Sequence, residues 1–372
     1  MMPGLNPSVQ GKGGFRSLIV VAKTVESSLI TSFHLEAADG ASLPAFRPGQ
    51  FLVFKIPSGN AKGYVLRNYS LSGTPDDLSQ YRISVKREPS AGPGLPVGLS
   101  SNFLHDSIGV GDVLVADGPR GEFVLDEVSD RPVVLLSGGV GLTPMVAMLH
   151  ALAHRSTRRT LFLHACENGD VHALREEVNR VIGQRPGLLA HYCYRGPMDG
   201  DRIANRFDSE GFITRDLLQS LLCLDDYDFY LCGPPPFMQA MYQTLLGLGV
   251  VKDRIAYEFF GPATVLDTEV KPKPVAPTAG TSPTPGVGAT TVEFRKSGIV
   301  AEWDGAADSL LSFAEEKGLA PEFSCRAGIC GTCASRIISG EVSYFEDPLE
   351  DVAPGELLLC CSRPKTAIVL DL

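Results

Sequence analysis

The most informative stretch of this 372-residue chain is Cys325-Arg-Ala-Gly-Ile-Cys330-Gly-Thr-Cys333, near the C-terminus. Its spacing is C-x4-C-x2-C, and the later stretch Leu-Leu-Leu-Cys360-Cys361 supplies a distant fourth cysteine. This spacing is typical of the thiolate ligands of a 2Fe–2S cluster. A tight loop provides three of the ligands, and the fourth comes from elsewhere in the fold.

Gly328 and Gly331 lie within this cysteine loop, where glycine lets the backbone fold closely around the sulfides. Zinc is the alternative metal, but zinc sites favour two short paired spacings instead of C-x4-C-x2-C. Cys361 competes with its neighbour for the position of fourth ligand. The cluster ligands that we predict are Cys325, Cys330, Cys333 and Cys360.

Length and composition indicate a multidomain globular protein, with 44% hydrophobic and 20% charged residues. No stretch approaches the length of a membrane span, and residues 1–6 have neither a basic start nor an apolar core. We therefore expect a cytoplasmic protein without a membrane partner. Nine cysteines then indicate metal and redox chemistry instead of disulfides. The net charge of −10 disfavours nucleic acid as a partner.

Residues 14–128 have the pattern of strands separated by turns. Residues 15–21, 29–37 and 50–56 are rich in β-forming side chains, and clusters of Pro, Gly, Asp and Ser separate them. This pattern predicts a small antiparallel barrel.

The pattern changes in residues 129–265. Residues 132–136 form a continuous apolar run, typical of a strand buried on both faces. A helix is expected from Pro144, a strand over 160–165 and a helix over 171–182. Alternation of strands and helices predicts an α/β domain with a parallel sheet.

Residues 266–290 contain five prolines and three glycines, a composition that cannot bury a core and predicts a linker. Residues 291–372 then form a separate small domain around the cluster. It carries seven Lys and Arg against fourteen Asp and Glu, a net −7. This acidity can steer the domain toward a basic surface, or serve solubility alone.

Two turns are candidates for binding a dinucleotide. Ser-Gly-Gly-Val-Gly-Leu-Thr-Pro at 137–144 follows the apolar strand, where glycines allow a pyrophosphate to approach the N-terminus of the next helix. Thr143 is predicted to cap that helix and Pro144 to take its first position. The alternative is an ordinary turn between a strand and a helix. The predicted binding residues are Gly139, Val140, Gly141, Leu142, Thr143 and Pro144.

The second turn begins with Cys232, Gly233 and Pro234 and ends another strand. In a parallel sheet both turns lie at the carboxyl edge, where ligands bind. Cys232 is expected to face the nicotinamide there, although a buried structural cysteine is the alternative.

In the barrel, Arg67-Asn68-Tyr69-Ser70 combines a cation, an aromatic ring and a hydroxyl. In a strand, Arg67 and Tyr69 point to one side, and Asn68 and Ser70 to the other. A flavin needs a positive partner for its phosphate, a flat surface for its ring and a hydrogen bond near N5. An ordinary edge strand is the alternative.

These motifs occur in the order found in the ferredoxin–NADP reductase superfamily, and the chain resembles the reductase half of flavohemoglobins most closely. The similarity extends over about residues 14–265, and the rest resembles a plant-type ferredoxin domain with a β-grasp fold. Further stretches that carry it lie at residues 98–106, 164–172 and 256–262.

The resemblance implies an FAD-binding barrel, with Tyr69 stacking on the flavin and Ser70 near its N5. It places Ser70, Cys232 and Glu258 as catalytic residues, and it implies FAD in preference to FMN. Core packing is the alternative for the aromatic residues, and a solvated carboxylate for Glu258. The cofactor-binding residues that it adds are Phe51, Arg67, Asn68, Ser101, Phe259, Phe260, Gly261 and Pro262.

In ferredoxin-like domains the fourth ligand often lies four residues before a proline, and Pro364 then selects Cys360. The chain begins almost at the barrel, so we expect no haem domain and no nitric oxide dioxygenation through an internal haem. A cluster domain at the other end resembles the reductase components of bacterial oxygenases and hydroxylases.

These patterns predict an NAD(P)H-dependent oxidoreductase that passes electrons through FAD and a 2Fe–2S cluster, singly, to a separate oxygenase or hydroxylase. A stand-alone reductase of small molecules, and a non-catalytic electron-transfer subunit or redox sensor, are the alternatives. Glu167 can bind a ribose hydroxyl and would repel a 2′-phosphate, which favours NADH.

Overall fold

The computed structural model describes residues 14–59, 63–89, 98–260, 290–305, 307–323, 328–329 and 331–372. The chain forms two compact units. The first comprises residues up to Gly233 together with Val251–Glu258, and the second comprises Pro234–Val250 and Phe259–Leu372.

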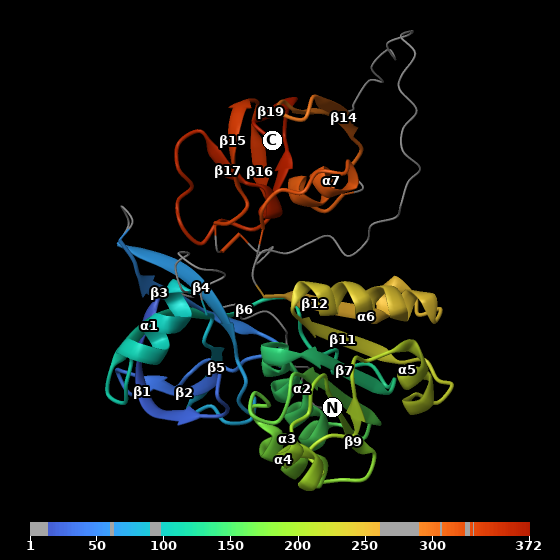
Figure 1. The fold of residues 1–372 in the computed structure, drawn as a ribbon. Coiled ribbons are helices and arrows are strands. Elements are labelled where there is room, and N and C mark those ends of the chain that lie inside the picture. Colours follow the sequence, from blue (N-terminus) through green and yellow to red (C-terminus); the bar gives the residue numbers. More distant parts are fainter. Residues whose placement is uncertain are drawn as a thin grey trace, which may run out of the picture. The chain divides into compact units, whose positions relative to one another are not determined.

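An antiparallel six-stranded sheet opens the first unit, in the order β4-β3-β6-β1-β2-β5 (Figure 1). A bridge between Leu71 and Ile83 joins the two edges of the sheet, just after β4 and within β5, and so closes it. The predicted antiparallel barrel is confirmed. The bounds of its elements are β1 Arg16–Val25, β2 Ile30–Ala37, β3 Phe51–Pro57, β4 Tyr64–Ser70, β5 Tyr81–Lys86, α1 Leu99–Ser107 and β6 Val113–Arg120.

The barrel is held together by side chains that alternate into its interior. Leu18, Phe33, Phe54 and Ile83 belong to one apolar cluster and are fully buried. Burying such side chains contributes roughly 2 kcal/mol each, which makes this cluster the main stabilising feature of the barrel. Ala147, from a helix of the following domain, is part of the same cluster.

The second sheet of the first unit has the order β10-β9-β8-β7-β11-β12. Strands β7 to β11 pair in parallel, so their carboxyl ends lie at one edge. The apolar run predicted as a doubly buried strand is β7, all of whose residues are buried. The strand bounds are β7 Val133–Gly138, β8 Thr160–Cys166, β9 Leu188–Tyr194, β10 Ser209–Glu210, β11 Asp228–Gly233 and β12 Ile255–Phe259.

Two predicted helix starts are wrong. Helix α2 spans Leu142–Arg155 and begins before Pro144, because a 3₁₀ turn over Gly139–Gly141 leads directly into it. Helix α3 spans Arg175–Ile182, since Leu174 has a left-handed backbone (φ 57°) that stops the helix from extending back to residue 171. The short helices α4 (Asp199–Ile203) and α5 (Arg215–Leu221) complete this part.

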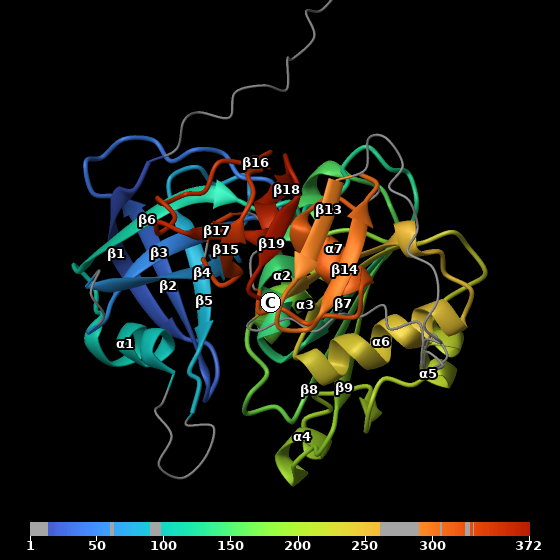
Figure 2. The ribbon, with the colours of Figure 1, turned by 90° about the horizontal axis from the view of Figure 1, so that it is seen from above.

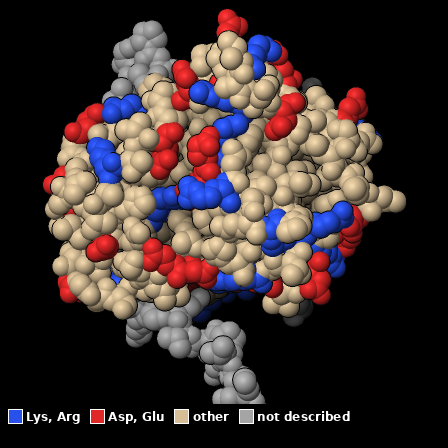
Figure 3. Space-filling model, turned by 90° about the horizontal axis from the view of Figure 1, so that it is seen from below, with Lys and Arg blue, Asp and Glu red and all other residues tan. Residues whose placement is uncertain are grey.

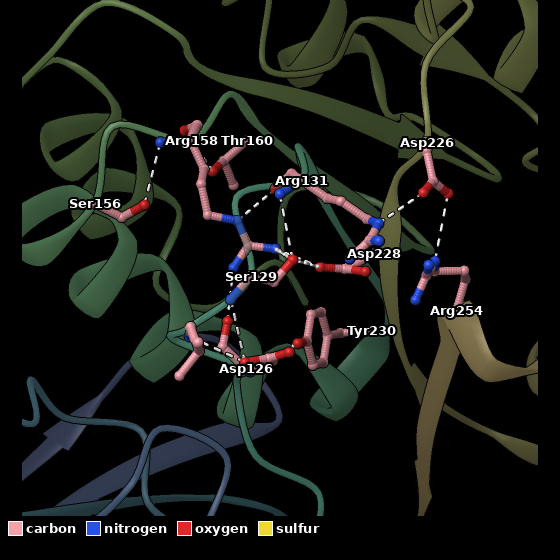
Figure 4. Close-up of polar contacts among 11 residues, drawn as sticks. Asp126, Ser129, Arg131, Ser156, Arg158, Thr160, Asp226, Asp228, Tyr230 and Arg254 are labelled. Carbon is pink, nitrogen blue, oxygen red and sulfur yellow. Dashed lines mark hydrogen bonds and ion pairs between the residues drawn. The ribbon is translucent and has the colours of Figure 1, made fainter.

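A buried ion pair ties the segment between barrel and sheet to the amino ends of the strands (Figure 4). Arg158 donates to Asp228 at 2.6 Å, and both side chains are nearly inaccessible. The same guanidinium donates to the backbone carbonyls of Asp126 and Arg131. These contacts satisfy both charges and fix residues 126–131 against the sheet.

The second unit contains helix α6 (Pro235–Gly247) and a small α+β domain. Its five-stranded sheet has the order β14-β13-β19-β15-β17, in which β13 and β19 are parallel and the other pairs antiparallel. Helix α7 packs on this sheet through Leu310 and Phe313, which share a core with Phe294 (Figure 2). The mixed sheet with one packed helix is the predicted ferredoxin-like domain. The bounds are β13 Thr290–Phe294, β14 Ile299–Trp303, α7 Leu310–Glu316, β15 Ala334–Ser339, β16 Val342–Tyr344, β17 Glu356–Leu358, β18 Ser362–Pro364 and β19 Ile368–Leu370.

Charges of both signs lie among one another on the face drawn in Figure 3. Many surface charges are paired, as are Arg131 with Asp226 and Arg202 with Glu210. Exposed pairs of this kind contribute little to stability. None of the described helices is both long and apolar enough to cross a bilayer.

Replacement of Arg158 by methionine should destabilise the protein by about 3 kcal/mol, because it leaves the buried Asp228 carboxylate without its partner. Urea denaturation followed by circular dichroism measures this change. Arg131→Met is the matched control, since it breaks an exposed pair with Asp226 at the same edge and should leave the unfolding free energy nearly unchanged. Equal stabilities of the two variants would contradict the role given to Arg158.

Candidate active site

Strand β4 carries the predicted flavin motif. Ser70 is buried, Arg67 is exposed, and the Tyr69 ring packs against the barrel core, edge-on to Phe54. Burial raises the pKa of Tyr69, so its hydroxyl stays neutral. The Asn68 Oδ1 atom is buried and has no hydrogen-bond partner among the described residues. A buried acceptor without a partner beside an aromatic ring suits a polar ring ligand.

Three predicted catalytic residues from distant parts of the sequence meet in the first unit. The Ser70 hydroxyl donates to Glu258 Oε2 at 3.4 Å, across 188 positions of sequence. Burial raises the pKa of Glu258 to about 8, although the Ser70 contact lowers it slightly. Burial also raises the pKa of the Cys232 thiol, and the nearby Glu258 charge raises it further. All three groups are therefore uncharged near neutral pH.

Phe51 starts β3 directly opposite Ser70 of β4. Its ring is only 3% exposed and packs over Gly121, where a Cβ atom would lie 2.7 Å from the ring. Gly121 also has φ 108°, so glycine is required there for two reasons. The flavin contact of Phe51 stays a prediction, and its packing is explained by the barrel alone.

The two predicted dinucleotide turns touch each other. A Cβ atom at Gly141 would lie 2.2 Å from the Cys232 carbonyl oxygen, so only glycine fits. Thr143 does not cap α2, because that helix starts at Leu142 and the Thr143 hydroxyl donates back to the Val140 carbonyl at 3.1 Å. Pro144 occupies the third helical position, where its missing N–H breaks no intrahelical bond. The second turn behaves as predicted, since β11 ends at Gly233 and α6 begins at Pro235.

Ser101, predicted to contact phosphates, is buried near the start of α1. Its hydroxyl accepts from the Glu88 N–H at 3.1 Å and donates to the Gly98 carbonyl at 3.3 Å. The adjacent Ser100 Oγ is buried without a partner among the described residues, so it is the hydroxyl left available for a ligand. In the sequence, only its position next to Ser101 marks Ser100.

Glu167 directly follows β8, and Arg195 directly follows β9, at the carboxyl edge of the sheet. Arg195 donates to Glu167 Oε2 at 2.7 Å, and both side chains remain largely exposed. The position of this carboxylate at the carboxyl edge is compatible with the predicted contact to ribose hydroxyls, which stays a prediction. The partnership with Arg195 was not foreseen.

Buried polar side chains pack together beside Ser137, which lies just before the glycine turn, and no sequence motif marks them. Ser137 Oγ lies 2.9 Å from His164 Nδ1, and His172 Nδ1 lies 2.7 Å from the Tyr194 hydroxyl. Burial lowers the pKa of His164 to about 4, so the ring is neutral. The imidazole rings of His164 and His172 lie 4.7 Å apart, measured between their centroids, so the two side chains form one buried polar group.

Two of the predicted cluster ligands are described in the second unit. The Sγ atoms of Cys333 and Cys360 are 3.1 Å apart and buried, and the Gly328 N–H donates to Cys360 Sγ at 3.3 Å. The Cys361 Sγ atom lies 3.8 Å from the Leu358 carbonyl, and a Cβ atom at Gly328 would lie 3.0 Å from it, so this thiol also lies close to the cysteine loop. Gly328 and Gly331 both have positive φ, as the tight loop requires. Cys325 and Cys330 lie outside the described residues, as do Gly261, Pro262 and residues 266–289 of the predicted linker, whose last residue, Thr290, begins β13 instead.

The remaining predicted residues and cysteines are located as follows. Phe259 ends β12 and is buried, and Phe260 follows it. Cys166 is half-buried and Cys193 is buried, whereas Cys223, which follows the end of α5, is exposed.

The residues present fit the three groups that the sequence implies. Unpartnered buried acceptors and hydroxyls at Asn68 and Ser100 suit a flavin nucleotide. Gly139, which has φ 53° and open space where a Cβ atom would lie, suits the approach of a pyrophosphate, and the adjacent thiols of Cys333 and Cys360 suit a cluster.

Comparison with known families gives the same assignment. Residues 17–125 match the oxidoreductase FAD-binding domain, residues 135–243 the oxidoreductase NAD-binding domain, and residues 293–365 the 2Fe-2S iron-sulfur cluster binding domain. Fold and site thus define an oxidoreductase with FAD, NAD and 2Fe–2S domains, and the prediction of FAD and a 2Fe–2S cluster is confirmed.

Individual relatives support each part of this assignment. The flavohemoprotein of Bacillus thuringiensis subsp. konkukian is 43% identical over 256 residues, which are 68% of this chain and 62% of that protein. The flavohem-like FAD/NAD-binding domain of nitric oxide dioxygenase from Vibrio cholerae is 39% identical, with 66% of this chain and 99% of that one covered and a TM-score of 0.58. Phthalate dioxygenase reductase is 26% identical, with 96% and 98% covered and a TM-score of 0.56.

The chain belongs to the ferredoxin–NADP reductase superfamily, as a flavohemoprotein-like FAD/NAD(P) reductase module joined to a 2Fe–2S ferredoxin domain. It spans about three fifths of the length of the curated relatives that it matches.

Glu258→Gln should change how stability depends on pH. The pKa of Glu258 is about 8 in the folded protein and about 4.5 unfolded, so its contribution to stability is lost as the pH rises between these values. The variant cannot ionise and should gain about 3 kcal/mol relative to the wild type between pH 6 and pH 9. Urea denaturation of flavin-free protein at both pH values measures this. The same difference at both pH values would exclude a raised pKa.

Proposed function

We propose that this protein oxidises NAD(P)H and delivers the electrons one at a time to a separate oxygenase or hydroxylase. The observation that carries the proposal is the meeting of Ser70, Cys232 and Glu258, from a barrel strand and two neighbouring strands of the nucleotide domain. Such a meeting of flavin-motif and nucleotide-turn residues is what hydride transfer requires, because the two reactants must approach within contact distance.

When bound, FAD would accept a hydride and release its two electrons singly, and the cluster would carry one electron at a time. Ser70 and Glu258 would hold a proton between Oγ and Oε2, since the raised pKa keeps the carboxyl protonated near pH 7. The Cys232 thiol stays neutral and acts as a small wall that orients the nicotinamide. It is not a nucleophile, because a thiol must ionise to become one.

The residues proposed to hold each group follow from the site. Arg67, Tyr69 and the Asn68 Oδ1 atom would bind the flavin, and Ser100 and Ser101 its phosphates. The backbone of the turn at 139–144 would bind the pyrophosphate of the dinucleotide. The proposed cluster ligands are Cys325, Cys330, Cys333 and Cys360, and the short distance between the last two favours Cys360 over Cys361.

The proposed acceptor is a protein because solved relatives are named as reductases of a dioxygenase or a cytochrome P450. The relatives include phthalate dioxygenase reductase, and the Amycolatopsis cytochrome P450 reductase GcoB, 25% identical with a TM-score of 0.57. We place the protein in the cytoplasm, where the reducing environment keeps thiols available as ligands.

NADH is the proposed donor. The Glu167 carboxylate would accept from the ribose hydroxyls and repel a 2′-phosphate, while Arg195 beside it limits that repulsion.

The proposed electron path is tested with the anaerobic holoprotein. Addition of NADH should bleach the flavin absorbance and then the cluster absorbance, and cytochrome c should be reduced in steady state. Cys360→Ser should remove the cluster spectrum and lower cytochrome c reduction by about tenfold or more, while ferricyanide reduction through the flavin persists. Failure of NADH and NADPH alike to bleach the flavin would exclude the function.

Cys361→Ser is the matched control for the ligand assignment, because the two cysteines are neighbours and both buried. This variant should keep the cluster spectrum. Loss of the cluster only in Cys361→Ser would reverse the assignment. If an added oxygenase is not reduced by the wild-type protein and NADH, the alternative function, a stand-alone reductase of small molecules, is favoured.

Glu167→Gln should raise the ratio of kcat/KM for NADPH to that for NADH by about tenfold, equivalent to about 1.4 kcal/mol. The physical reason is that the variant frees Arg195 for a 2′-phosphate and removes a repulsive charge. Steady-state kinetics with both donors measures the ratio. Asp225→Asn, which breaks the exposed pair with Arg159 at 2.7 Å near the opposite edge, should leave it unchanged.

A further inference from the structure

Helix α2 belongs to the nucleotide domain but also packs into the barrel. Ala147 lies in the apolar core of the barrel. The Met148 methyl group approaches Gly49, where a Cβ atom would lie 2.7 Å from Met148 Cε and 2.0 Å from the Phe123 carbonyl oxygen. Gly49 also has φ 107°, so the turn before Phe51 depends on glycine. One helix therefore connects the dinucleotide turn at its start with the barrel at its middle.

Polar side chains make a second connection further along α2. Arg82 of β5 donates to both carboxylate oxygens of Glu177 on α3, at 2.6 and 2.8 Å. His150 Nε2 on α2 lies 2.7 Å from Glu177 Oε1. All three side chains are at least 86% buried, with exposed fractions of 10%, 14% and 13%. Buried ionic contacts have strict geometry, so this group sets where the helix lies.

The electrostatics agree with a stable ion pair. Burial alone would raise the pKa of Glu177, but the hydrogen bonds from His150 and Arg82 outweigh it and lower the pKa to about 2. The carboxylate is therefore charged throughout the range in which such enzymes work, and the pair with Arg82 persists.

Arg82 is also bonded to the segment that follows the flavin motif. Its guanidinium donates to the Ser72 carbonyl and lies 3.3 Å from the Ser72 hydroxyl. The Ser72 N–H donates to the Arg82 carbonyl at 2.8 Å. Ser72 is two residues beyond Ser70, and buried Ser84 binds its hydroxyl at 2.8 Å. The path from Ser70 through Ser72, Arg82 and Glu177 to α2 is thus continuous.

Packing alone does not set this contact. A half-open cleft of about 210 Å³ lies beside it, lined by Thr74, Gln80 and Arg180 as well as by the ionic group. The Thr74 Oγ1 and His150 Nδ1 atoms are buried without partners among the described residues. Where side chains do not fill the space, directional bonds determine the alignment.

A more exposed set of contacts lies at the end of α2. Asp76, from the barrel, accepts from His154 at 3.0 Å and from Arg155 Nε at 2.8 Å. Arg155 also donates to Glu127 at 3.1 Å. These side chains are about 40% exposed, so they contribute less than the buried group.

We propose that Arg82, Glu177 and His150 are positioning residues for hydride transfer, which hold α2 and its dinucleotide turn in fixed alignment with the flavin strand. This inference rests on the proposed function. The three residues touch neither reactant. They act through Ser72 on the flavin side and through the body of α2 on the nicotinamide side. Because a small misalignment slows transfer strongly, their loss lowers the rate without weakening NADH binding to the same degree.

The test uses the full-length holoprotein and stopped-flow reduction of the flavin by NADH. Arg82→Met and Glu177→Gln should each lower the limiting rate by about tenfold or more, while the dissociation constant for NADH changes by less than about threefold. The long-wavelength absorbance of nicotinamide stacked on flavin should weaken. Arg131→Met, an arginine of an exposed pair, should match the wild type in rate and absorbance.

If Arg82→Met and Glu177→Gln both reduce the flavin at the wild-type limiting rate, the inference is overturned. If either variant loses FAD, His150→Gln decides, because it keeps the pair between Arg82 and Glu177: a rate that falls supports the inference, and a wild-type rate overturns it. Failure of the proposed function is distinguishable, since the wild type would then show no reduction by NADH or NADPH.

Discussion

The close approach of the Gly141 backbone to the Cys232 carbonyl is the contact on which the site depends. It joins the turns after β7 and β11, which are neighbours in the sheet, and it leaves no room for a side chain at residue 141. A parallel sheet brings its turns to one edge, but only this glycine lets them touch. The thiol of Cys232 and the start of α2 are thereby held in one place.

The groups around this contact are polar but uncharged near neutral pH. Burial raises the pKa of both Glu258 and Cys232, and burial lowers that of His164. Desolvation disfavours the ionised form of every buried group, so it raises the pKa of an acid and lowers the pKa of a base. In both cases the group stays neutral.

The two units divide the chemistry of the protein. The first contains the flavin motif and the dinucleotide turns, and the second contains the ferredoxin-like domain with its paired thiols. The first unit also contains two buried ion pairs outside the predicted site residues, Arg82 with Glu177 and Arg158 with Asp228. The first pair connects β5 of the barrel with α3, and the second connects the residues before β8 with the start of β11. The barrel strands themselves are held by their apolar core.

The sequence by itself determined the barrel, the parallel sheet and the cluster domain, because periodicity, glycine turns and cysteine spacing are local signals. It also picked out Ser70, Cys232 and Glu258, through motifs shared with a family. Tertiary structure alone decided that Arg82 meets Glu177, 95 positions away, and that α2 begins at Leu142. No local pattern marks an arginine whose partner lies in another domain. The reason is that burial, which gives such a pair its strength, exists only once the chain has folded.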